Sequence, residues 1–404
     1  MTGKDLKIGV YGGMFTPVRD SVNQAIACEQ LGLDVVAFTD QISGNVPNEA
    51  FYDLEIAKMW KHQHGFCDAL MLAGVVAAQT EKIGLTIAAI DTLRNSPTRL
   101  AQQILTLDHL SGGRATVALG VSEAKNALQY GHSRVGATAK FYDASRIIRA
   151  ILDRPGEPIL YNGEKYSMKG GIIDLPQYGD NTARIYGACG SSSDNIDIIG
   201  ECYDGMMTVI PSFCQGGPEQ VADDIVKVRE AAERHGRDPE KLGFTAVAMV
   251  LMHDDPEVIE RVAATDYMRW NAYIYGCARG SDWDQHGFTH PAGPDYGYAR
   301  HLVPERMTKE EWYTEARKVS PQAVSDVAHV SGTAEDVAER LKAYVEAGVD
   351  ELILLDHAPA GDLSLAMDSA ANMGRLVAAL RGTKSDGPPA GIGYVGLANA
   401  VVPS

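Results

Sequence analysis

The chain has 404 residues, of which 45% are hydrophobic, so it can bury a large core in one elaborate domain or two smaller ones. Its net charge of −17 is unsuited to binding nucleic acid or an anionic membrane, and its apolar runs are too short to span one. The six cysteines form no CxxC pair, and the N-terminus lacks the pattern of a secretory signal. We therefore expect a cytoplasmic protein with reduced thiols.

Eight short apolar runs predict buried parallel strands, because neither face of these runs carries a regular series of polar residues. The runs are 7–13, 35–40, 82–90, 115–121, 184–190, 205–212, 244–252 and 351–357. Amphipathic segments between them predict helices, notably 97–111, 218–236 and 333–348. Eight consecutive β-α units favour a (β/α)8 TIM barrel. An open doubly wound sheet is the alternative, but no GxGxxG fingerprint follows the first run.

Two connections are longer than a minimal barrel needs, namely 41–80 after the second strand and 265–330 after the seventh. Long connections in a compact domain are usually functional. We expect 1–382 to form one barrel domain and 383–404, rich in Gly and Pro, to form a tail outside it.

The connection 265–330 is rich in aromatic residues, which line most ligand pockets. We expect it to act as a lid or substrate wall, with Trp283, Phe288 and His290 facing the substrate. The alternative interpretation is a surface excursion with no role in binding.

Polar residues follow several predicted strands, at the end of a TIM barrel where active sites lie. Asp40 and Gln41 follow the second strand, and Glu123 and Asn126 follow the fourth. Further polar residues at strand ends are Asp91, Arg94, Asp356 and His357. Glu123 is either a carboxylate that binds a ligand or moves a proton, or an ordinary loop carboxylate.

The fifth strand ends in a small-residue loop, "GACGSSSDN", that leads into a helix. Gly190 permits close backbone approach, and Ser191, Ser192 and Ser193 add donors near the helix N-terminus, which suits a phosphate group. A serine-rich turn with an N-cap is the alternative. No metal site is predicted, because the spacing of His62 and His64 has no carboxylate near it in the sequence.

Three of these segments carry a family resemblance. "GLDVVAFTDQ" (32–41), "LSGGRATVALGVSEAKN" (110–126) and "RIYGACGSSSDNIDIIGECYDGMM" (184–207) resemble the bacterial luciferase-like superfamily, and within it the branch that uses the deazaflavin coenzyme F420. The resemblance implies a TIM barrel of the luciferase-like type that forms a homodimer. One position departs from the branch, because Gln41 stands where a histidine is usual, and glutamine cannot act as a general base near neutral pH.

The resemblance also implies a set of site residues. Glu123 would lie by the polar edge of the deazaflavin as proton donor or relay, and Asp40 and Gln41 would lie beside the reacting groups. Ile87 and Ala88 would form a bulge under the ring, often a non-proline cis peptide. The implied cofactor-binding residues are Asp40, Ile87, Ala88, Val121, Asn126, Cys189, Gly190, Ser191, Ser192 and Ser193.

The resemblance implies an oxidoreductase that transfers a hydride between reduced coenzyme F420 and a ketone or activated double bond of a fairly apolar small molecule. In such an enzyme the cofactor performs the redox chemistry, and the protein orients it and supplies a proton. One alternative is a monooxygenase on the same barrel that uses FMN and oxygen. The other is a non-catalytic barrel that only binds a cofactor or metabolite.

Overall fold

The structure, a computed structural model, describes residues 6–13, 16–179, 183–188 and 190–383. Eight parallel strands pair in the order β1-β2-β3-β4-β7-β8-β9-β11, and β11 pairs with β1, which closes the sheet. They are β1 (Lys7–Tyr11), β2 (Val35–Phe38), β3 (Gly84–Asp91), β4 (Ala115–Gly120), β7 (Arg184–Gly187), β8 (Gly205–Ile210), β9 (Gly243–Met252) and β11 (Glu351–Asp356). Each overlaps one predicted run, and helices separate them, which confirms the predicted (β/α)8 TIM barrel.

Both faces of the barrel strands are apolar, which is why these strands read as continuous apolar runs. Leu352 and Leu354 of β11 join the core between strands and helices, whereas Ile353 belongs to the cluster inside the barrel. That inner cluster consists of Ala37, Ala88, Ala118, Tyr186, Met207, Val247 and Ile353. The three alanines come from the neighbouring strands β2, β3 and β4. Their small side chains leave space inside the barrel on this side.

The helices of the outer ring begin and end where local sequence signals predict. α5 (Pro97–Ser111) coincides with the predicted helix 97–111, and its N-cap Ser96 accepts a hydrogen bond from a backbone N–H of the first turn. α15 (Ala334–Glu346) begins after Thr333, which forms a reciprocal capping box with Asp336. α9 (Gly217–Arg234) corresponds to the third predicted helix.

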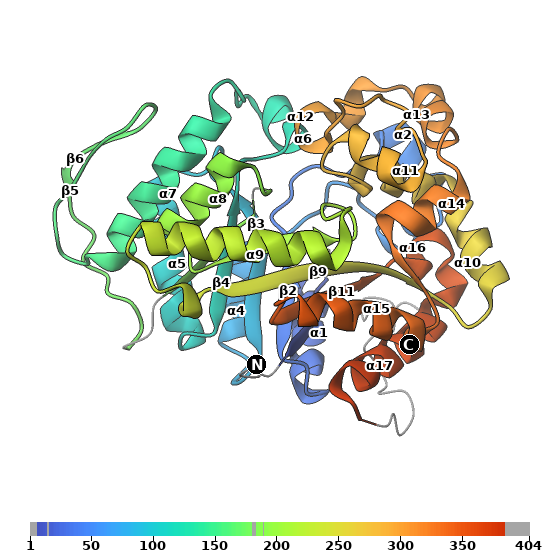
Figure 1. The fold of residues 1–404 in the computed structure, drawn as a ribbon, viewed down its shortest axis with the longest axis horizontal. Helices are drawn as coiled ribbons and strands as arrows, with labels where there is room; N and C mark the ends of the chain where they lie inside the picture. The colour runs from blue at the N-terminus through green and yellow to red at the C-terminus, as the bar shows by residue number, and fades with distance from the viewer. Residues whose placement is uncertain (1–5, 14–15, 180–182, 189, 384–404) are drawn as a thin grey trace.

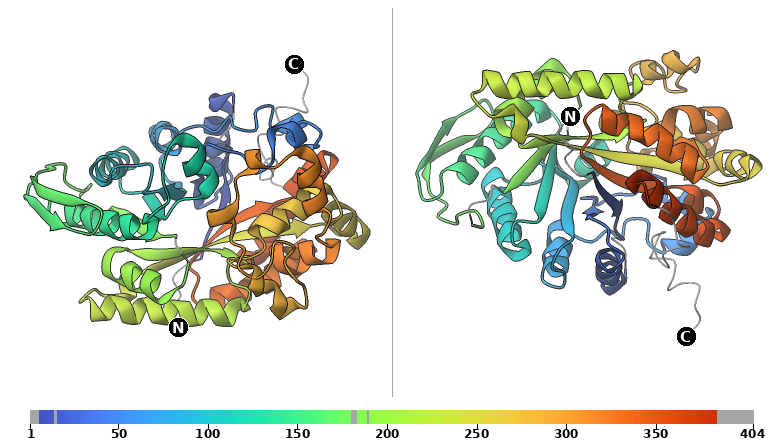
Figure 2. Two further views of the ribbon diagram at one scale, coloured as in Figure 1. Left: turned by 90° about the horizontal axis from the view of Figure 1, so that it is seen from above. Right: turned by 60° about the horizontal axis from the view of Figure 1, so that its bottom comes forward.

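The remaining long helices of the ring lie between strands in the same way, and the right-hand view of Figure 2 shows them around the barrel. They are α1 (Val18–Gln30), α4 (Ala69–Ala77), α7 (Ala137–Asp153), α8 (Ser193–Cys202) and α17 (Ala366–Arg381). The short helices α6 (Ala124–Ala127) and α16 (Ala358–Gly361) follow β4 and β11. Among the described helices, none combines the length and the apolar character that a membrane crossing requires.

The connection between β9 and β11 forms a group of helices with its own hydrophobic core. The group contains α10 (Pro256–Ala263), α11 (Asp266–Tyr275), α12 (Tyr298–His301), α13 (Lys309–Ala316), α14 (Pro321–Ala323), 3₁₀ turns at Gly280–His286 and Pro304–Arg306, and a π turn at Val324–Ala328. The connection after β2 joins the same core through α2 (Asn48–Phe51) and α3 (Ile56–Met59), and Figure 1 shows α2 beside α11 and α13. Both long connections therefore pack together.

Three strands lie outside the predicted runs. β5 (Ile159–Asn162) and β6 (Ser167–Gly171) form an antiparallel hairpin that projects from the molecule (Figure 1). Their residues are largely exposed, so the hairpin has no continuous apolar run that would reveal it. The carboxylate of Asp143 in α7 holds it through the Tyr161 hydroxyl and two backbone N–H groups. The short β10 (Val330–Gly332) extends the pairing of β9. Apart from Thr383, the predicted tail 383–404 lies outside the described residues.

Candidate active site

A cavity of about 860 Å³ lies at the ends of the barrel strands where the chain leaves the sheet. Its walls include residues that follow β1, β2, β4, β7, β8 and β11, residues within the last half of β3, and residues of the insertion between β9 and β11. This is the end of a TIM barrel where catalytic groups gather. The volume is within the range of cofactor and ligand pockets.

Most of the predicted site residues line this cavity. They are Asp40, Gln41, Ala88, Val121, Glu123, Asn126, Gly190, Ser191 and Ser192. The sequence assigns them to four different strands, and the closed barrel brings the ends of these strands around one space.

Glu123 is held by donors from two directions. It accepts a hydrogen bond from Asn126 Nδ2 at 3.0 Å, and its Oε2 lies 3.0 Å from Lys125 Nζ. The phenol of Tyr298 in the insertion lies close to the same carboxylate. Burial, followed by the charge of Glu123, raises the pKa of Tyr298 well above its ordinary value, so the phenol remains a donor. Glu123 therefore connects β4 to the insertion that covers the cavity.

Lys125 is fully buried, which is unusual for a lysine. Its ammonium group contacts Glu123, the side-chain oxygen of Gln41 and, at 3.1 Å, the carbonyl of Ser43. Burial lowers its pKa, and the neighbouring Glu123 counteracts this. One cation thus holds the loop after β2 against the turn after β4.

Asn126 strengthens the same connection. Its Oδ1 accepts hydrogen bonds from the backbone N–H groups of Ile42 and Ser43, both at 3.1 Å. Its Nδ2 donates to Glu123 and to Gln41 Oε1. Both ends of the amide are therefore engaged by the protein, and Asn126 shapes the cavity wall by fixing the loop after β2.

Arg94 joins two carboxylates at the ends of β2 and β3. Its Nη2 donates to Asp40 Oδ2 at 2.6 Å and its Nε donates to Asp91 Oδ2 at 2.6 Å. Ser122 Oγ donates to the same Asp91 oxygen at 2.7 Å, which ties the end of β4 into the group. Burial raises the pKa of Asp40, and the positive charge of Arg94 opposes that rise.

The loop after β7 presents backbone and hydroxyl groups to the cavity. Gly190 has φ +77°, a left-handed conformation that favours glycine, and Ser191 and Ser192 line the cavity beside it. Ser192 caps α8, whose N-terminus therefore faces the same region. Backbone N–H groups at a helix N-terminus favour an anion such as phosphate. Ser193 is the first residue of α8 and does not line the cavity, and Cys189 lies outside the described residues.

The predicted bulge under the ring lies one residue further along β3. The pairing of β3 with β4 shifts register between Ile87 and Ile90, and the cis peptide joins Ala88 and Ala89. Ala88 and Ala89 line the cavity. Ile87 does not, because its side chain points outward into the core between the strands and the helices, where it is fully buried.

The aromatic residues predicted to face the substrate lie elsewhere. Trp283 and His290 are almost fully buried, the first donating its indole N–H to the carbonyl of Gly276 and the second bonding the carbonyl of Tyr273. Phe288 packs against the same core. None of the three lines the cavity, because they fill the hydrophobic core of the insertion.

Other residues of the insertion form the wall instead. Tyr275 and Tyr298 line the cavity, and their rings pack edge to face with centroids 5.0 Å apart. Asn45 Nδ2 donates to the Tyr275 hydroxyl at 2.8 Å. The insertion 265–330 therefore contributes one wall of the cavity, although Trp283, Phe288 and His290 are not among its lining residues.

Several further cavity residues escaped the sequence reasoning as site residues. Arg134, Arg300, Tyr11 and His357 all line the cavity. Arg134 donates to the carbonyl of Ser122. His357 had been noted only as a polar residue at the end of the last strand. A search for histidines directly after predicted strands would have selected it.

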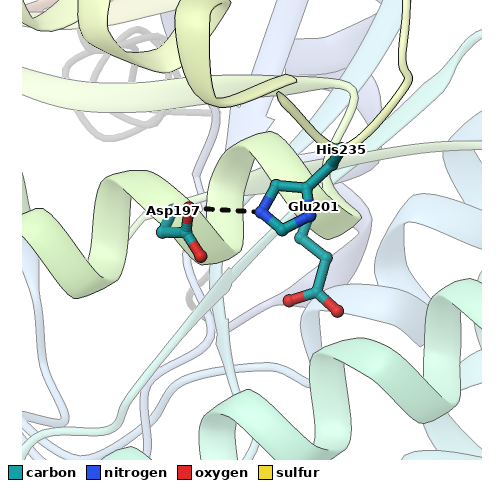
Figure 3. Close-up of side chains that lie close together, drawn as sticks. All are labelled: Asp197, Glu201 and His235. Atoms are coloured by element: carbon teal, nitrogen blue, oxygen red, sulfur yellow. Dashed lines mark hydrogen bonds and ion pairs between the residues drawn. The ribbon is translucent and has the colours of Figure 1, made fainter. Parts of the chain in front are cut away.

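One group of side chains elsewhere has metal-binding geometry among the described residues. Asp197 and Glu201 of α8 and His235 at the end of α9 bring ligand atoms within 4.8 Å of one another (Figure 3). Arg146 occupies both oxygens of Glu201, and Arg234 and His235 share one oxygen of Asp197. The two arginines compensate the carboxylates already, so the group is explained as a surface ion-pair network.

Comparison with known proteins identifies a family whose sequence model matches most of the chain. The sequence model of the family described as luciferase-like monooxygenase matches residues 5–351. Phthiodiolone/phenolphthiodiolone dimycocerosates ketoreductase of Mycobacterium kansasii is 25% identical over 286 residues, which cover 71% of this chain and 76% of that protein.

Solved structures show the same fold. An F420-dependent secondary alcohol dehydrogenase, solved with an F420–acetone adduct, has a TM-score of 0.65 at 19% identity, covering 89% of this chain and 97% of its own. A riboflavin lyase, solved with modified FMN and riboflavin, has a TM-score of 0.62 at 16% identity, covering 95% of this chain and 94% of its own.

Replacing Arg94 by Met tests the electrostatic group at the ends of β2 and β3. Without Arg94 the pKa of Asp40, already raised by burial, rises further. A carboxyl whose pKa is higher in the folded than in the unfolded state destabilises the fold increasingly as the pH rises. We expect R94M to reduce the free energy of unfolding by about 3 kcal/mol at neutral pH and by less in mild acid, measured by urea unfolding.

The matched control for this experiment is Arg317→Met, which removes an exposed pair with Asp266. Exposed pairs contribute roughly 1 kcal/mol or less. Equal destabilisation by the two replacements, or a loss in R94M that does not depend on pH, would contradict this account of Arg94.

Proposed function

Because the chain belongs to the luciferase-like monooxygenase family, we propose that it is an oxidoreductase that transfers a hydride between coenzyme F420 and a ketone, or another activated double bond, of a fairly apolar small molecule. The observation that carries this proposal is the cavity itself. Gly190, Ser191 and Ser192 offer it an anion site at the N-terminus of α8, and Glu123 lies on the wall formed by β4. A cofactor with a phosphate at one end and a polar ring edge at the other fits these two features.

The proposed choice of coenzyme rests on similarity as well as geometry. The structural neighbour with a TM-score of 0.65 is an F420-dependent secondary alcohol dehydrogenase in complex with an F420–acetone adduct, and the relative from Mycobacterium kansasii is a ketoreductase. Both descriptions concern the interconversion of ketones and alcohols. FMN is the alternative cofactor, supported by the riboflavin lyase that shares the fold.

We propose that Glu123 lies beside the polar ring edge of the bound cofactor. When F420 is bound it supplies the hydride chemistry, and its ring edge changes its demand for protons as the redox state changes. Glu123, in contact with the phenol of Tyr298 and the ammonium of Lys125, is placed to hold or move such a proton. Gln41 contacts Lys125 and so helps to orient Glu123, but its amide does not itself transfer a proton.

The substrate is proposed to lie against the insertion. Tyr275 and Tyr298 provide aromatic surface, and Met249 of β9 and Met207 of β8 add apolar surface to the same cavity. Aromatic and apolar walls with a few polar groups are typical of pockets for small organic molecules. This composition favours a fairly apolar substrate.

Separate titrations with F420 and FMN test the cofactor. We expect F420 to bind at least tenfold more tightly than FMN. The reason is that the segments 32–41, 110–126 and 184–207, which supply much of the cavity wall, resemble the deazaflavin branch. The change in cofactor fluorescence gives both dissociation constants. Tight FMN binding without F420 binding would establish the monooxygenase alternative. Binding of F420 without turnover of any ketone or alcohol would establish the non-catalytic alternative.

Replacing Glu123 by Gln tests its role in turnover. We expect kcat to fall at least about 10²-fold, the lower end of the contribution of acid–base groups, while F420 affinity stays within a few-fold. Pre-steady-state hydride transfer at saturating cofactor measures the effect. Asp40→Asn is the comparison variant and should weaken cofactor binding first. An unchanged rate in E123Q would make Glu123 an ordinary loop carboxylate.

We also propose that the protein is a homodimer, and that the partner covers the outer face of α4 and α5. The side chains of Met71 and Val75 in α4 are 74% and 47% exposed, and Leu110 at the end of α5 is 50% exposed. α4 and α5 are in contact, so these residues share one apolar surface. A helix with apolar residues on its solvent side usually packs against another surface.

Replacing Met71 by Lys should disrupt this dimer, because a charge would have to be buried in the interface. Light scattering coupled to size exclusion should report twice the chain mass of 43.5 kDa for the unmodified protein and a shift toward the single mass for M71K. Met367→Lys is the control, since Met367 of α17 is 70% exposed and lies on another helix. If both variants keep the mass of the unmodified protein, the proposed interface is wrong.

A further inference from the structure

The end of β11 carries a buried pair of histidines that the proposed roles of Glu123 and Asp40 do not use. His357 directly follows β11 and lines the cavity, and its backbone N–H donates to the carbonyl of Val250 in β9 at 3.0 Å. His329, which follows the π turn of the insertion, is fully buried behind it. His329 Nε2 and His357 Nδ1 lie 2.8 Å apart.

The hydrogen bonds around this pair determine where its protons lie. His329 Nδ1 lies 2.9 Å from the carbonyl oxygen of Val324, and a carbonyl can only accept, so His329 Nδ1 carries the hydrogen. In a neutral imidazole the other nitrogen, His329 Nε2, is then an acceptor. His357 Nδ1 must therefore donate to it. This leaves His357 Nε2 with a free lone pair, a tautomer assigned from the hydrogen-bond network.

Both imidazoles remain neutral over the ordinary pH range. Burial lowers the pKa of His329 to about 4. Burial, followed by the proximity of His329, lowers the pKa of His357 well below its usual value. A second hydrogen between the two rings would set two N–H donors against each other and leave one positive charge in a site with little water. The neutral pair with one shared hydrogen is the form that the surroundings favour.

His357 Nε2 remains available to a ligand. Among the described residues this nitrogen has no hydrogen-bond partner. It is also absent from the set of fully buried polar atoms without partners, so solvent or a ligand can reach it. The residue retains 6% of its surface, on a side chain that lines the cavity. The cavity therefore contains an imidazole acceptor whose orientation is fixed from behind.

The position of this acceptor complements that of Glu123. In the closed order of eight strands, β11 and β4 are four places apart and so lie on opposite sides of the barrel. Tyr11 of β1, the neighbour of β11, is close enough to Glu123 for that charge to affect its phenol. A molecule in the cavity can thus face Glu123 on one side and the β11 side on the other.

We propose that His357 is a catalytic residue whose Nε2 accepts the hydroxyl proton of a secondary alcohol, the reduced partner of the ketone in the proposed reaction. This inference rests on the proposed function and specifies its substrate couple. In the oxidation direction the alcohol loses a hydride from its carbinol carbon and a proton from its hydroxyl, and a C=O bond forms. The hydride would pass to oxidised F420, which would become the reduced cofactor, and the proton would pass to Nε2 and then to water. In the reverse direction His357 Nε2 relays a proton from water to the carbonyl oxygen.

His329 is a positioning residue in this scheme. It does not line the cavity, and it acts by accepting the hydrogen of His357 Nδ1. This contact holds the ring so that Nε2, and not an N–H group, faces the substrate. The scheme also supplies the imidazole that Gln41 cannot provide at the end of β2, although from the opposite side of the barrel.

The first test needs no cofactor and no turnover. In protein labelled with ¹⁵N-histidine, the resonances of residue 357 are identified by their loss in His357→Gln. We expect the ¹⁵N shifts of a protonated Nδ1 and an unprotonated Nε2. A protonated Nε2 would overturn the inference, whatever the fate of the proposed enzymatic reaction.

The second test measures hydride transfer from cyclohexanol to F420 in a stopped-flow instrument. We expect His357→Gln to slow the transfer about 10²-fold, the lower range for a general base, with F420 affinity changed less than about threefold. In His357→Ala, added imidazole should restore part of the rate, which a purely structural role would not produce. His253→Gln is the control, because His253 follows the neighbouring strand β9 outside the cavity lining.

The outcomes separate the two proposals. If the unmodified protein transfers hydride but H357Q does so equally fast, the role of His357 is wrong and the proposed function stands. Loss of F420 binding together with the rate would make His357 structural and would also overturn its catalytic role. If the unmodified protein oxidises no secondary alcohol with F420, the proposed alcohol couple fails, and with it the role of His357.

Discussion

The charged side chains at the ends of β2, β3 and β4 lie where water has little access, and each therefore needs a partner within the protein. Arg94 compensates Asp40 and Asp91, and Lys125 compensates Glu123. Arg94 follows β3 but binds Asp40 after β2, and Lys125 follows β4 but also contacts Gln41 and Ser43 after β2. The need to pair buried charges thus holds three consecutive loops in one arrangement, and the polar side of the cavity depends on it.

The opposite side of the cavity is built differently. Around β11 the buried polar groups include two neutral imidazoles, whose hydrogen bonds run in one direction toward the carbonyl of Val324, and the carboxyl group of Asp356, whose pKa burial raises to about 6. The phenols of Tyr275 and Tyr298 in the insertion lie near enough to Glu123 for its charge to add to the effect of burial, and both causes raise their pKa values well above normal. The side formed by β2, β3 and β4 therefore carries paired charges, whereas the side of β11 carries the two neutral imidazoles and one buried carboxyl group. This asymmetry suits a reaction in which a polar ring edge and a fairly apolar substrate bind side by side.

The insertion shows how a single helix serves two purposes. In α11, Tyr273 belongs to the insertion's own core and stacks on Trp270, with ring centroids 4.7 Å apart. Tyr275 stands two residues later, on another side of the helix, and lines the cavity. Residues two apart on a helix do not share a face. The core that contains Trp283 and His290 thus supports the wall without contributing those residues to it.

The sequence by itself determined the barrel and the ends of its helices. A strand buried on both faces must be apolar throughout, and a helix start is stabilised by a local cap such as Ser96, so these features are written in neighbouring residues. Asp40 and Glu123 could be placed at strand ends for the same reason, because each lies at or just after the end of an apolar run. The exposed hairpin β5–β6 has no such signature, because its residues bury little surface and a carboxylate from α7 holds it.

Only the tertiary structure decided which of these residues meet. Whether Ile87 faces the cavity or the outer core depends on a register shift in β3, and a displacement of one residue reverses the face of a strand. The aromatic residues of the insertion could be divided between core and wall only by packing the helices. The pairing of His357 with His329 joins residues 28 positions apart, and the Lys125–Gln41 contact joins residues 84 apart. Such contacts depend on the closure of the barrel and the seating of the insertion, which no local pattern encodes.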